Sequence, residues 1–149
     1  MRCTIGADDT GPLTEALLAE LERRGIAAER FGALRALRQA QDDVEDGEWA
    51  SIGRAVGEAV AAGRADVGIV CCWTSTGISI AANKVRGVRA ALCADAETAA
   101  GARRWNDANV LALSLRATSP AVGLEILAAF LGSQASTDSA DRRSIEAVE

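Results

Sequence analysis

Short runs with strand-forming residues alternate along this chain with longer amphipathic stretches. The short runs predict five strands, at Cys3–Ala7, Ala28–Phe31, Val67–Cys72, Val88–Cys93 and Asn109–Leu113, of which Val67–Cys72 is expected to be buried. The stretches that follow them favour helices at Leu13–Arg24, Trp49–Ala62, Gly77–Lys84, Ala96–Arg104 and Ala121–Leu131. Strands and helices are therefore expected to alternate strictly from the first strand to the last long helix.

This alternation is typical of the α/β class. It favours a parallel sheet that is covered by helices on both faces and connected by right-handed crossovers. The length of 149 residues has room for one domain. We therefore predict a single Rossmann-like three-layer αβα domain with a five-stranded parallel sheet at residues 1–132.

Two segments fall outside the regular pattern. The connection that contains Asp42, Asp43, Glu45 and Asp46 is acidic and predicts a solvated loop. Residues 133–149 are polar, with a short helix around Arg142–Val148, and this tail is either frayed or packed on a partner subunit.

Composition and charge exclude several classes of function. The net charge is −5 and the arginines are scattered, so we expect no nucleic-acid partner and no membrane-surface partner. The four cysteines have no metal-ligand spacing and the chain contains no histidine, so we expect no metal and no cofactor. The N-terminus enters a strand without an apolar signal core, which predicts a cytoplasmic protein with reduced thiols.

The fold class predicts where a ligand would bind. In open α/β sheets the ligand lies at the carboxyl ends of the strands, and in a flavodoxin-like strand order the crevice opens between the first and third strands. Two loops are marked by this rule, at residues 6–12 and 71–77. In the second loop Cys72 ends a strand beside a helix N-terminus, where a thiolate is favoured, whereas Cys71 must point to the opposite face.

These residues also have ordinary structural interpretations. A cysteine in an apolar strand is most often part of the core, and we interpret Cys3 and Cys93 in that way. Thr74, Ser75 and Thr76 are common loop and N-cap residues. Asp8 and Asp9 are typical of a turn before a helix. The residue types alone leave both interpretations open.

Three segments, Ser79–Lys84, Gly87–Cys93 and Asn106–Leu111, occur in an order and at intervals that resemble a known family. They are similar to ribose-5-phosphate isomerase B and the related galactose-6-phosphate isomerase subunits, from residue 2 to about residue 132. The resemblance implies a metal-independent homodimer, or a dimer of dimers, that opens a furanose sugar phosphate. It also implies that a proton moves between C1 and C2 through a cis-enediolate.

The resemblance also assigns roles to individual residues. Cys72 matches the catalytic base and Thr74 the hydroxyl that supports it. Asp8 matches an aspartate that contacts sugar hydroxyls, Asn106 an asparagine near the enediolate, and Arg116 an arginine placed toward the phosphate. The remaining candidates are Asp9 as a catalytic residue and Trp73, Ser75, Thr76, Gly77, Trp105 and Arg142 as substrate-binding residues.

The sequence departs from the family at several of these positions. Asp9 and Trp105 stand where the family has histidines, and an indole does not transfer protons near neutral pH. The candidates to replace the ring-opening histidine are Asp9, Asp107 and Glu97. We therefore expect a substrate other than ribose 5-phosphate, such as a smaller or acyclic sugar phosphate or a less charged sugar. Trp73 and Trp105 either narrow the pocket for it or pack against neighbouring helices.

The function favoured at this stage is an aldose–ketose isomerase of a sugar phosphate. One alternative is a relative that binds sugar phosphates without turnover, which the absence of histidine would explain. Another is an isomerase of a sugar without phosphate. A nucleotide-binding function is weaker, because no Gly-x-Gly-x-x-Gly turn follows the first predicted strand.

Overall fold

The structure, a computed structural model, describes residues 1–35 and 47–148. The acidic connection at Asp42–Asp46 lies outside the described residues. The strands are β1 (Cys3–Ala7), β2 (Ala28–Gly32), β3 (Val67–Cys72), β4 (Ala90–Leu92) and β5 (Val110–Ser114). The helices are α1 (Pro12–Arg23), α2 (Trp49–Ala61), α3 (Thr76–Asn83), α4 (Ala96–Asn106), α5 (Pro120–Gly132) and α6 (Ser139–Glu146).

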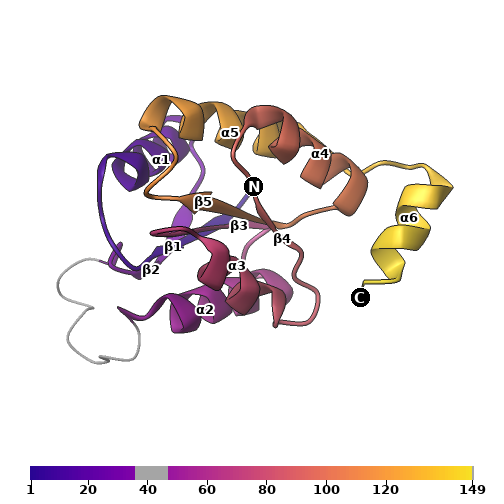
Figure 1. The fold of residues 1–149 in the computed structure, drawn as a ribbon, viewed down its shortest axis with the longest axis horizontal. Coiled ribbons are helices and arrows are strands. Elements are labelled where there is room, and N and C mark those ends of the chain that lie inside the picture. Colours follow the sequence, from indigo (N-terminus) through magenta and orange to yellow (C-terminus); the bar gives the residue numbers. More distant parts are fainter. Residues whose placement is uncertain (36–46, 149) are drawn as a thin grey trace.

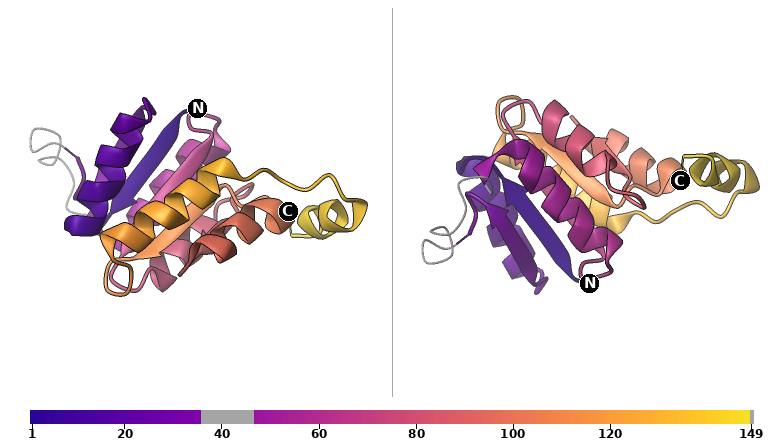
Figure 2. Two further views of the ribbon diagram at one scale, coloured as in Figure 1. Left: turned by 90° about the horizontal axis from the view of Figure 1, so that it is seen from above. Right: turned by 90° about the horizontal axis from the view of Figure 1, so that it is seen from below.

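All strand pairs of the sheet are parallel, and helices cover both of its faces. Helices α1, α4 and α5 lie on one face and α2 and α3 on the other (Figures 1 and 2). Each face has its own apolar cluster, built mainly from Leu, Ile, Val and Ala. The predicted three-layer α/β domain with five parallel strands is therefore confirmed.

The strand order is β2-β1-β3-β5-β4, which corrects the flavodoxin-like order at one edge. Strand β5 takes the interior place beside β3 because its apolar run is buried on both faces, whereas β4 has only three partly buried or exposed residues. The predicted strand Val88–Cys93 is shortened to Ala90–Leu92. The place where strand order reverses, between β1 and β3, is as predicted.

The outer edge of β4 is partly covered by a side chain. The Asn83 amide donates to the carbonyl of Ala90 (2.9 Å) and accepts from its N–H (2.8 Å). These two bonds occupy backbone groups that an added strand would otherwise pair with. The short β4 edge is thus blocked at Ala90.

The cysteine pair of β3 is divided between the two faces. Cys71 belongs to the cluster under α1, α4 and α5, and Cys72 to the cluster under α2 and α3. Burial raises the pKa of Cys71 to about 12, and it raises the pKa of Cys3 to about 12 as well. Cys71 and Cys3 are therefore core thiols, as the alternation of side chains along a strand requires.

The polar tail forms a helix at its far end. Asp138 caps α6 by accepting a hydrogen bond from the N–H of Ala140 (2.7 Å). The segment before it is held to α4 by a bond from the Ser136 N–H to the Arg104 carbonyl (2.7 Å). Helix α6 has no buried residue and extends from the side of the domain (Figure 1). Within the described ranges, no helix is long and apolar enough to span a bilayer.

Candidate active site

Three chain segments meet at the carboxyl edge of the central strands. Ala7 pairs with Cys71, so Asp8 follows β1 at the level of Cys72. Cys72 in turn pairs with Ser114, the last residue of β5. The loops after β1, β3 and β5 are therefore brought together around the end of β3.

The loop after β3 is fixed from inside by Ser75. Its backbone has a positive φ of 59°, and its side chain is fully buried. The Ser75 hydroxyl accepts a hydrogen bond from the Cys72 N–H (2.9 Å) and donates to the Leu113 carbonyl (2.5 Å). This hydroxyl therefore faces the protein interior, and its role here is to join the β3 loop to β5.

Replacing Ser75 with alanine is expected to lower the free energy of unfolding by about 1–3 kcal/mol, because buried backbone groups lose their partner. Ser79→Ala is the matched control: its hydroxyl donates only to a carbonyl of its own helix, that of Thr76 (2.8 Å), where alanine is a good helix former. Urea denaturation of both variants measures the difference. Equal losses would show that Ser75 does not hold the loop.

Cys72 lies at the base of this loop with a nearly buried side chain (5% exposed). Three residues of the loop that follows it, Trp73, Thr74 and Thr76, are open to solvent. Trp73 is 65% exposed, and the hydroxyls of Thr74 and Thr76 form a hydrogen bond with each other at 2.9 Å. Thr74 also lines a cavity of about 430 Å³ together with Ser114 and Arg116; Cys72 is not among its lining residues. The thiol thus lies directly beneath an exposed polar loop.

The loop after β1 brings two carboxylates to the same edge. Burial raises the pKa of Asp8, and the negative charge of Asp9 raises it further. Burial raises the pKa of Cys71, and the negative charge of Asp8 adds to this rise. Asp9 is exposed and accepts a hydrogen bond from the Thr10 N–H (2.8 Å).

Two residues of this edge were not expected from the sequence. Ser114 donates a hydrogen bond to the Trp73 carbonyl (2.8 Å) and lines the cavity beside Thr74. In the sequence, Ser114 could have been found as the first polar residue after the apolar run at residues 110–113. The Trp49 ring lies where a side chain on Gly77 would be, 3.0 Å from an ideal Cβ. Gly77 therefore makes room for Trp49, which no local sequence pattern indicates.

The other predicted residues lie at the opposite edge of the sheet. Helix α4 starts after the carboxyl end of β4 and runs back toward the amino end of β5, so Trp105 and Asn106 lie at the amino edge. They line a cavity of about 540 Å³ with Asn83 and Arg89, closed on one side by Ser144, Ile145 and Val148 of the C-terminal segment. Arg142 is exposed on α6, the helix that contributes Ser144 and Ile145 to this cavity, but it is not itself a lining residue.

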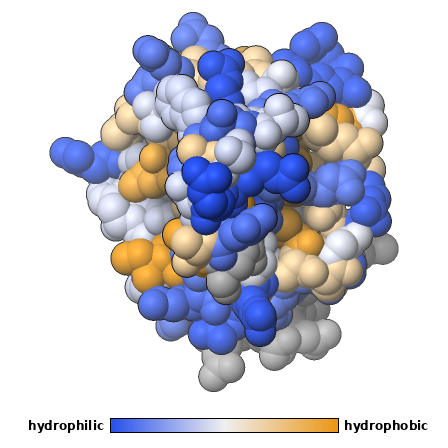
Figure 3. Space-filling view, turned by 90° about the vertical axis from the view of Figure 1, so that its right-hand side faces the viewer, coloured by the Kyte–Doolittle hydropathy of each residue, from blue (hydrophilic) through white to orange (hydrophobic). Residues whose placement is uncertain are grey.

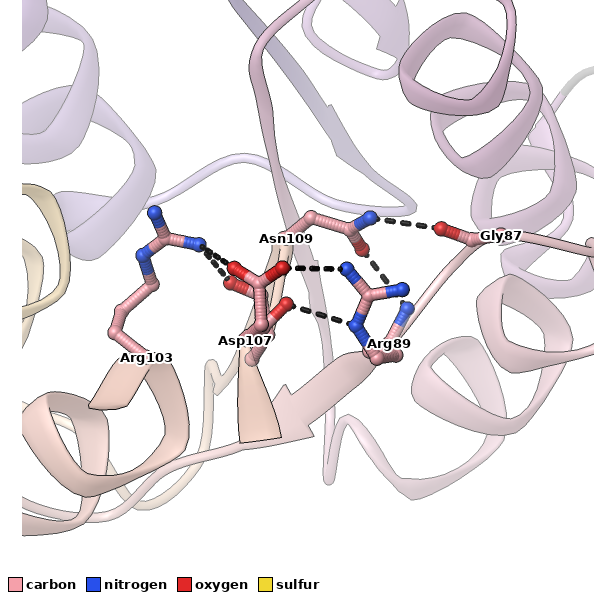
Figure 4. A network of polar contacts seen from close by, with 6 residues as sticks. Gly87, Arg89, Arg103, Asp107 and Asn109 are labelled. Atoms are coloured by element: carbon pink, nitrogen blue, oxygen red, sulfur yellow. Dashed lines mark hydrogen bonds and ion pairs between the residues drawn. The ribbon is translucent and has the colours of Figure 1, made fainter. Parts of the chain in front are cut away.

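A network of charges fixes the chain just after Asn106 (Figure 4). The Asp107 carboxylate forms ion pairs with Arg89 (3.0 Å) and Arg103 (3.4 Å). The backbone carbonyl of Asp107 also accepts a hydrogen bond from Arg89 Nε (2.9 Å). The Asn109 amide accepts from the Arg89 N–H and donates to the Gly87 carbonyl, both at 2.8 Å. The end of α4 and the start of β4 are therefore clamped together, which sets the position of Asn106.

Trp105 folds back along its own helix. An ideal Cβ on Gly101 would lie 2.6 Å from its ring, and the guanidinium of Arg104 lies 6.0 Å from the ring centroid. The indole is nevertheless 53% exposed. Figure 3 looks at this side of the molecule and shows apolar patches between hydrophilic ones. Trp105 is thus partly packed on Gly101 and partly available to a neighbour.

The structure thus separates the predicted residues into two groups. Asp8, Asp9, Cys72, Trp73, Thr74, Ser75, Thr76, Gly77 and Arg116 lie at the carboxyl edge, whereas Trp105, Asn106 and Arg142 lie at the amino edge or on α6. In the part of the chain that the structure describes, no group of three or more Cys, Asp or Glu side chains could hold a metal ion.

Comparison with known proteins gives a consistent result. The family model described as Ribose/Galactose Isomerase matches residues 3–148. Ribose-5-phosphate isomerase B of Escherichia coli is 33% identical over 141 residues, covering 89% of this chain and 85% of that protein. D-erythrulose-4-phosphate isomerase of Pectobacterium atrosepticum is 42% identical over 76 residues, covering 51% of this chain and 50% of that protein. For two other curated relatives the match covers less than half of their length.

A solved structure extends the similarity to the whole fold. Ribose-5-phosphate isomerase B of Clostridium thermocellum superimposes with a TM-score of 0.85 and 34% sequence identity. The alignment covers 99% of this chain and 95% of that one. The shared architecture therefore includes the C-terminal segment as well as the αβα domain.

Proposed function

Because the chain belongs to the ribose/galactose isomerase family, we propose that it interconverts an aldose phosphate and its ketose phosphate. The observation that carries this proposal is the convergence of Cys72, Asp8 and the N-terminus of α3 at the carboxyl edge of β3. A thiolate there is placed to take a proton from a carbon beside a carbonyl. The backbone N–H groups at the start of α3 can hold the negative charge that develops on oxygen.

The proposed reaction moves two protons, one from C2 to C1 and one from O2 to O1, and no heavier atom. The Cys72 thiolate removes the proton from C2 of the aldose, and the electron pair forms a cis-enediolate whose charge rests on the oxygens. Asp8 contacts the sugar hydroxyls and carries the second proton from O2 to O1, and the Cys72 thiol gives its proton to C1, which yields the ketose and restores the thiolate. Thr74 supports the thiolate, and Arg116 binds the phosphate at the far end.

We extend the proposal to a homodimer with shared sites. Trp105, Asn106 and Arg142 lie at the edge opposite Cys72, so one copy of the chain holds only half of the expected site. The amino-edge half carries exposed apolar groups, among them Val148 (73% exposed), and α6 has no buried residue. A second copy packed there would cover these groups and bring Asn106 to the Cys72 loop of its partner.

A mixing experiment tests the shared site. Cys72→Ser and Asn106→Ala chains are each expected to be inactive, and their co-refolded mixture is expected to regain about one quarter of the parent activity, since half of the random dimers carry one intact site. Each variant refolded alone is the control. A mixture as inactive as its components would place the whole site within one chain.

The isomerase function is tested by solvent exchange. The protein is incubated in D₂O with a panel of four- to six-carbon sugar phosphates, and deuterium at C2 is measured. We expect incorporation with at least one member of the panel. Tight binding without exchange, unchanged by Cys72→Ser, would instead support the alternative of a protein that binds sugar phosphates without turnover. The near-complete burial of the Cys72 side chain is the observation that favours this alternative.

A further inference from the structure

A second cavity adjoins the one described at the amino edge and lies along α4, beside β4. Its volume is about 570 Å³, and the two cavities share Ala91, Trp105 and Asn106 among their lining residues. One side of α4 lines it, since residues 98, 101, 102 and 105 follow one another at helical spacing. We call this cavity the α4 groove. Its size is typical of a site for a small ligand.

The indole of Trp105 provides an aromatic surface in the α4 groove. Its ring lies against Gly101, whose ideal Cβ would come within 2.6 Å of it, so a side chain at that position would push the indole away from the helix. The indole is 53% exposed, and the Arg104 guanidinium lies 6.0 Å from the ring centroid, at the outer limit of a cation–π contact. The aromatic surface is therefore accessible, and its position depends on the missing side chain of Gly101.

The two ends of the groove carry groups that can bind hydroxyls. Glu97 and Thr98 line it in the first turn of α4, and Asn106 lines it at the last residue of the helix. The Thr98 hydroxyl donates to Asp95 Oδ2 (2.8 Å), which leaves the lone pairs of its oxygen to accept from a ligand. The groove thus places hydrogen-bond acceptors at both ends of an indole, an arrangement that fits a neutral ligand with several hydroxyls.

The charge of the groove decides which part of a sugar phosphate it fits. The described residues that line it include two acidic side chains, Asp95 and Glu97, and no Lys or Arg. Hydrogen bonds from Thr98 lower the pKa of Asp95, so this carboxylate is negative near neutral pH. A phosphate group would be repelled there, whereas the uncharged carbon skeleton of the sugar would not.

We infer that the α4 groove is the subsite for the sugar ring, and that one C–H face of the closed ring stacks on the indole of Trp105. The sugar hydroxyls then bind to the polar residues at the two ends of the groove. The inference rests on the proposed isomerase function and assigns Trp105 as its specificity-determining residue, which favours closed-ring over open-chain sugar phosphates of the same length. It agrees with the proposed dimer, because Asn106, which would reach the Cys72 loop of the partner, follows Trp105 directly and lines the same groove.

Closed and open forms of one carbon skeleton test the stacking. 1,4-Anhydroribitol 5-phosphate is a furanose ring that cannot open, and ribitol 5-phosphate is its open-chain counterpart with the same charge. The six-carbon pair is 1,5-anhydroglucitol 6-phosphate and glucitol 6-phosphate. Titration calorimetry with the intact protein measures Kd for all four. We expect the closed member of at least one pair to bind about tenfold more tightly, the size of one aromatic contact. Trp105→Ala should remove this preference, and Trp105→Phe should keep most of it.

Gly101→Ala displaces the indole without removing it. We expect this variant to raise the KM of the sugar phosphate that the protein turns over about tenfold and to leave kcat near the parent value, because the added Cβ occupies the place of the ring. Gly132→Ala is the matched control, since it also lies in a helix but nothing comes within 4 Å of its ideal Cβ. In a Trp105→Ala background, Gly101→Ala should have no further effect, because both changes act through the same ring. Equal effects in both backgrounds would mean that Gly101 does not act through Trp105.

The outcomes separate this inference from the function on which it rests. Suppose that the protein exchanges deuterium at C2 of a sugar phosphate. Equal affinities within both pairs, no binding of either closed ring, or a ring preference that survives Trp105→Ala would then overturn the inference and leave the isomerase function standing. If no closed or open phosphate binds and no sugar phosphate is exchanged, the isomerase function fails, and the inference fails with it.

Discussion

Replacement of Cys72 by serine is expected to lower kcat about 10²–10⁴-fold, the range of a lost general base. A serine hydroxyl at this position has nearly the same size, but it is ionised far less readily than a thiol. The measurement is the rate of deuterium incorporation at C2 together with the isomerisation rate. A thermal melt of the variant should stay close to that of the parent, because the shape of the side chain is preserved.

The neighbouring cysteine provides a matched control. Cys71 points to the other face of the sheet, where it packs in the cluster under α1 and α5, and its pKa is raised by burial. Cys71→Ala is expected to lower the free energy of unfolding by about 1–2 kcal/mol through a small cavity and to leave kcat near the parent value. A Cys72→Ser variant with full exchange activity would show that the base lies elsewhere.

Replacement of Gly32 by alanine is expected to destabilise the domain strongly. Gly32 has a φ of +62°, and an ideal Cβ there would come within 3.0 Å of the Ala7 carbonyl oxygen and the Ile52 side chain. The left-handed conformation costs about 1–2 kcal/mol in a non-glycine residue, and overpacking adds about 1–3 kcal/mol. We therefore expect a loss of about 2–5 kcal/mol in urea denaturation.

Gly63 isolates the contribution of the close contacts. Its φ of +69° is similar, but nothing lies within 4 Å of its ideal Cβ. Gly63→Ala is thus expected to lose only the conformational part, about 1–2 kcal/mol. If both variants lose the same free energy, the contacts of Gly32 with Ala7 and Ile52 contribute nothing. Since Ala7 precedes Asp8, the Gly32 variant is also expected to raise KM.

Local patterns in the sequence were sufficient to predict the layers of this fold. The alternation of side chains placed Cys71 and Cys72 on opposite faces, and the short runs of strand-forming residues located every strand of the sheet. Strand order at the outer edge could not be predicted in this way. Whether β4 or β5 lies beside β3 depends on which strand is buried on both faces, and that is decided by contacts between distant segments.

The candidate site was predictable to a similar extent. The carboxyl-end rule and the resemblance identified the loops that hold Asp8 and Cys72, and the structure brings these two residues together. No sequence pattern showed that Ser75 turns inward, because this follows from its positive φ. The separation of Asn106 from Cys72 was also missed, since it depends on the direction of α4. The site roles and the cytoplasmic location stay predictions.

The hydrogen bonds between the loops after β3 and β5 have a consequence for substrate length. Besides the Ser75 bond to Leu113, the Leu115 N–H donates to the Cys72 carbonyl and the Arg116 N–H to the Trp73 carbonyl, both at 3.0 Å. The segment that bears the thiol and the segment that bears the guanidinium therefore move as one rigid body. Under the roles proposed above for Cys72 and Arg116, this fixed spacing would set the length of the sugar phosphate that the site accepts, and a sugar with one more carbon would have to bind with its chain bent.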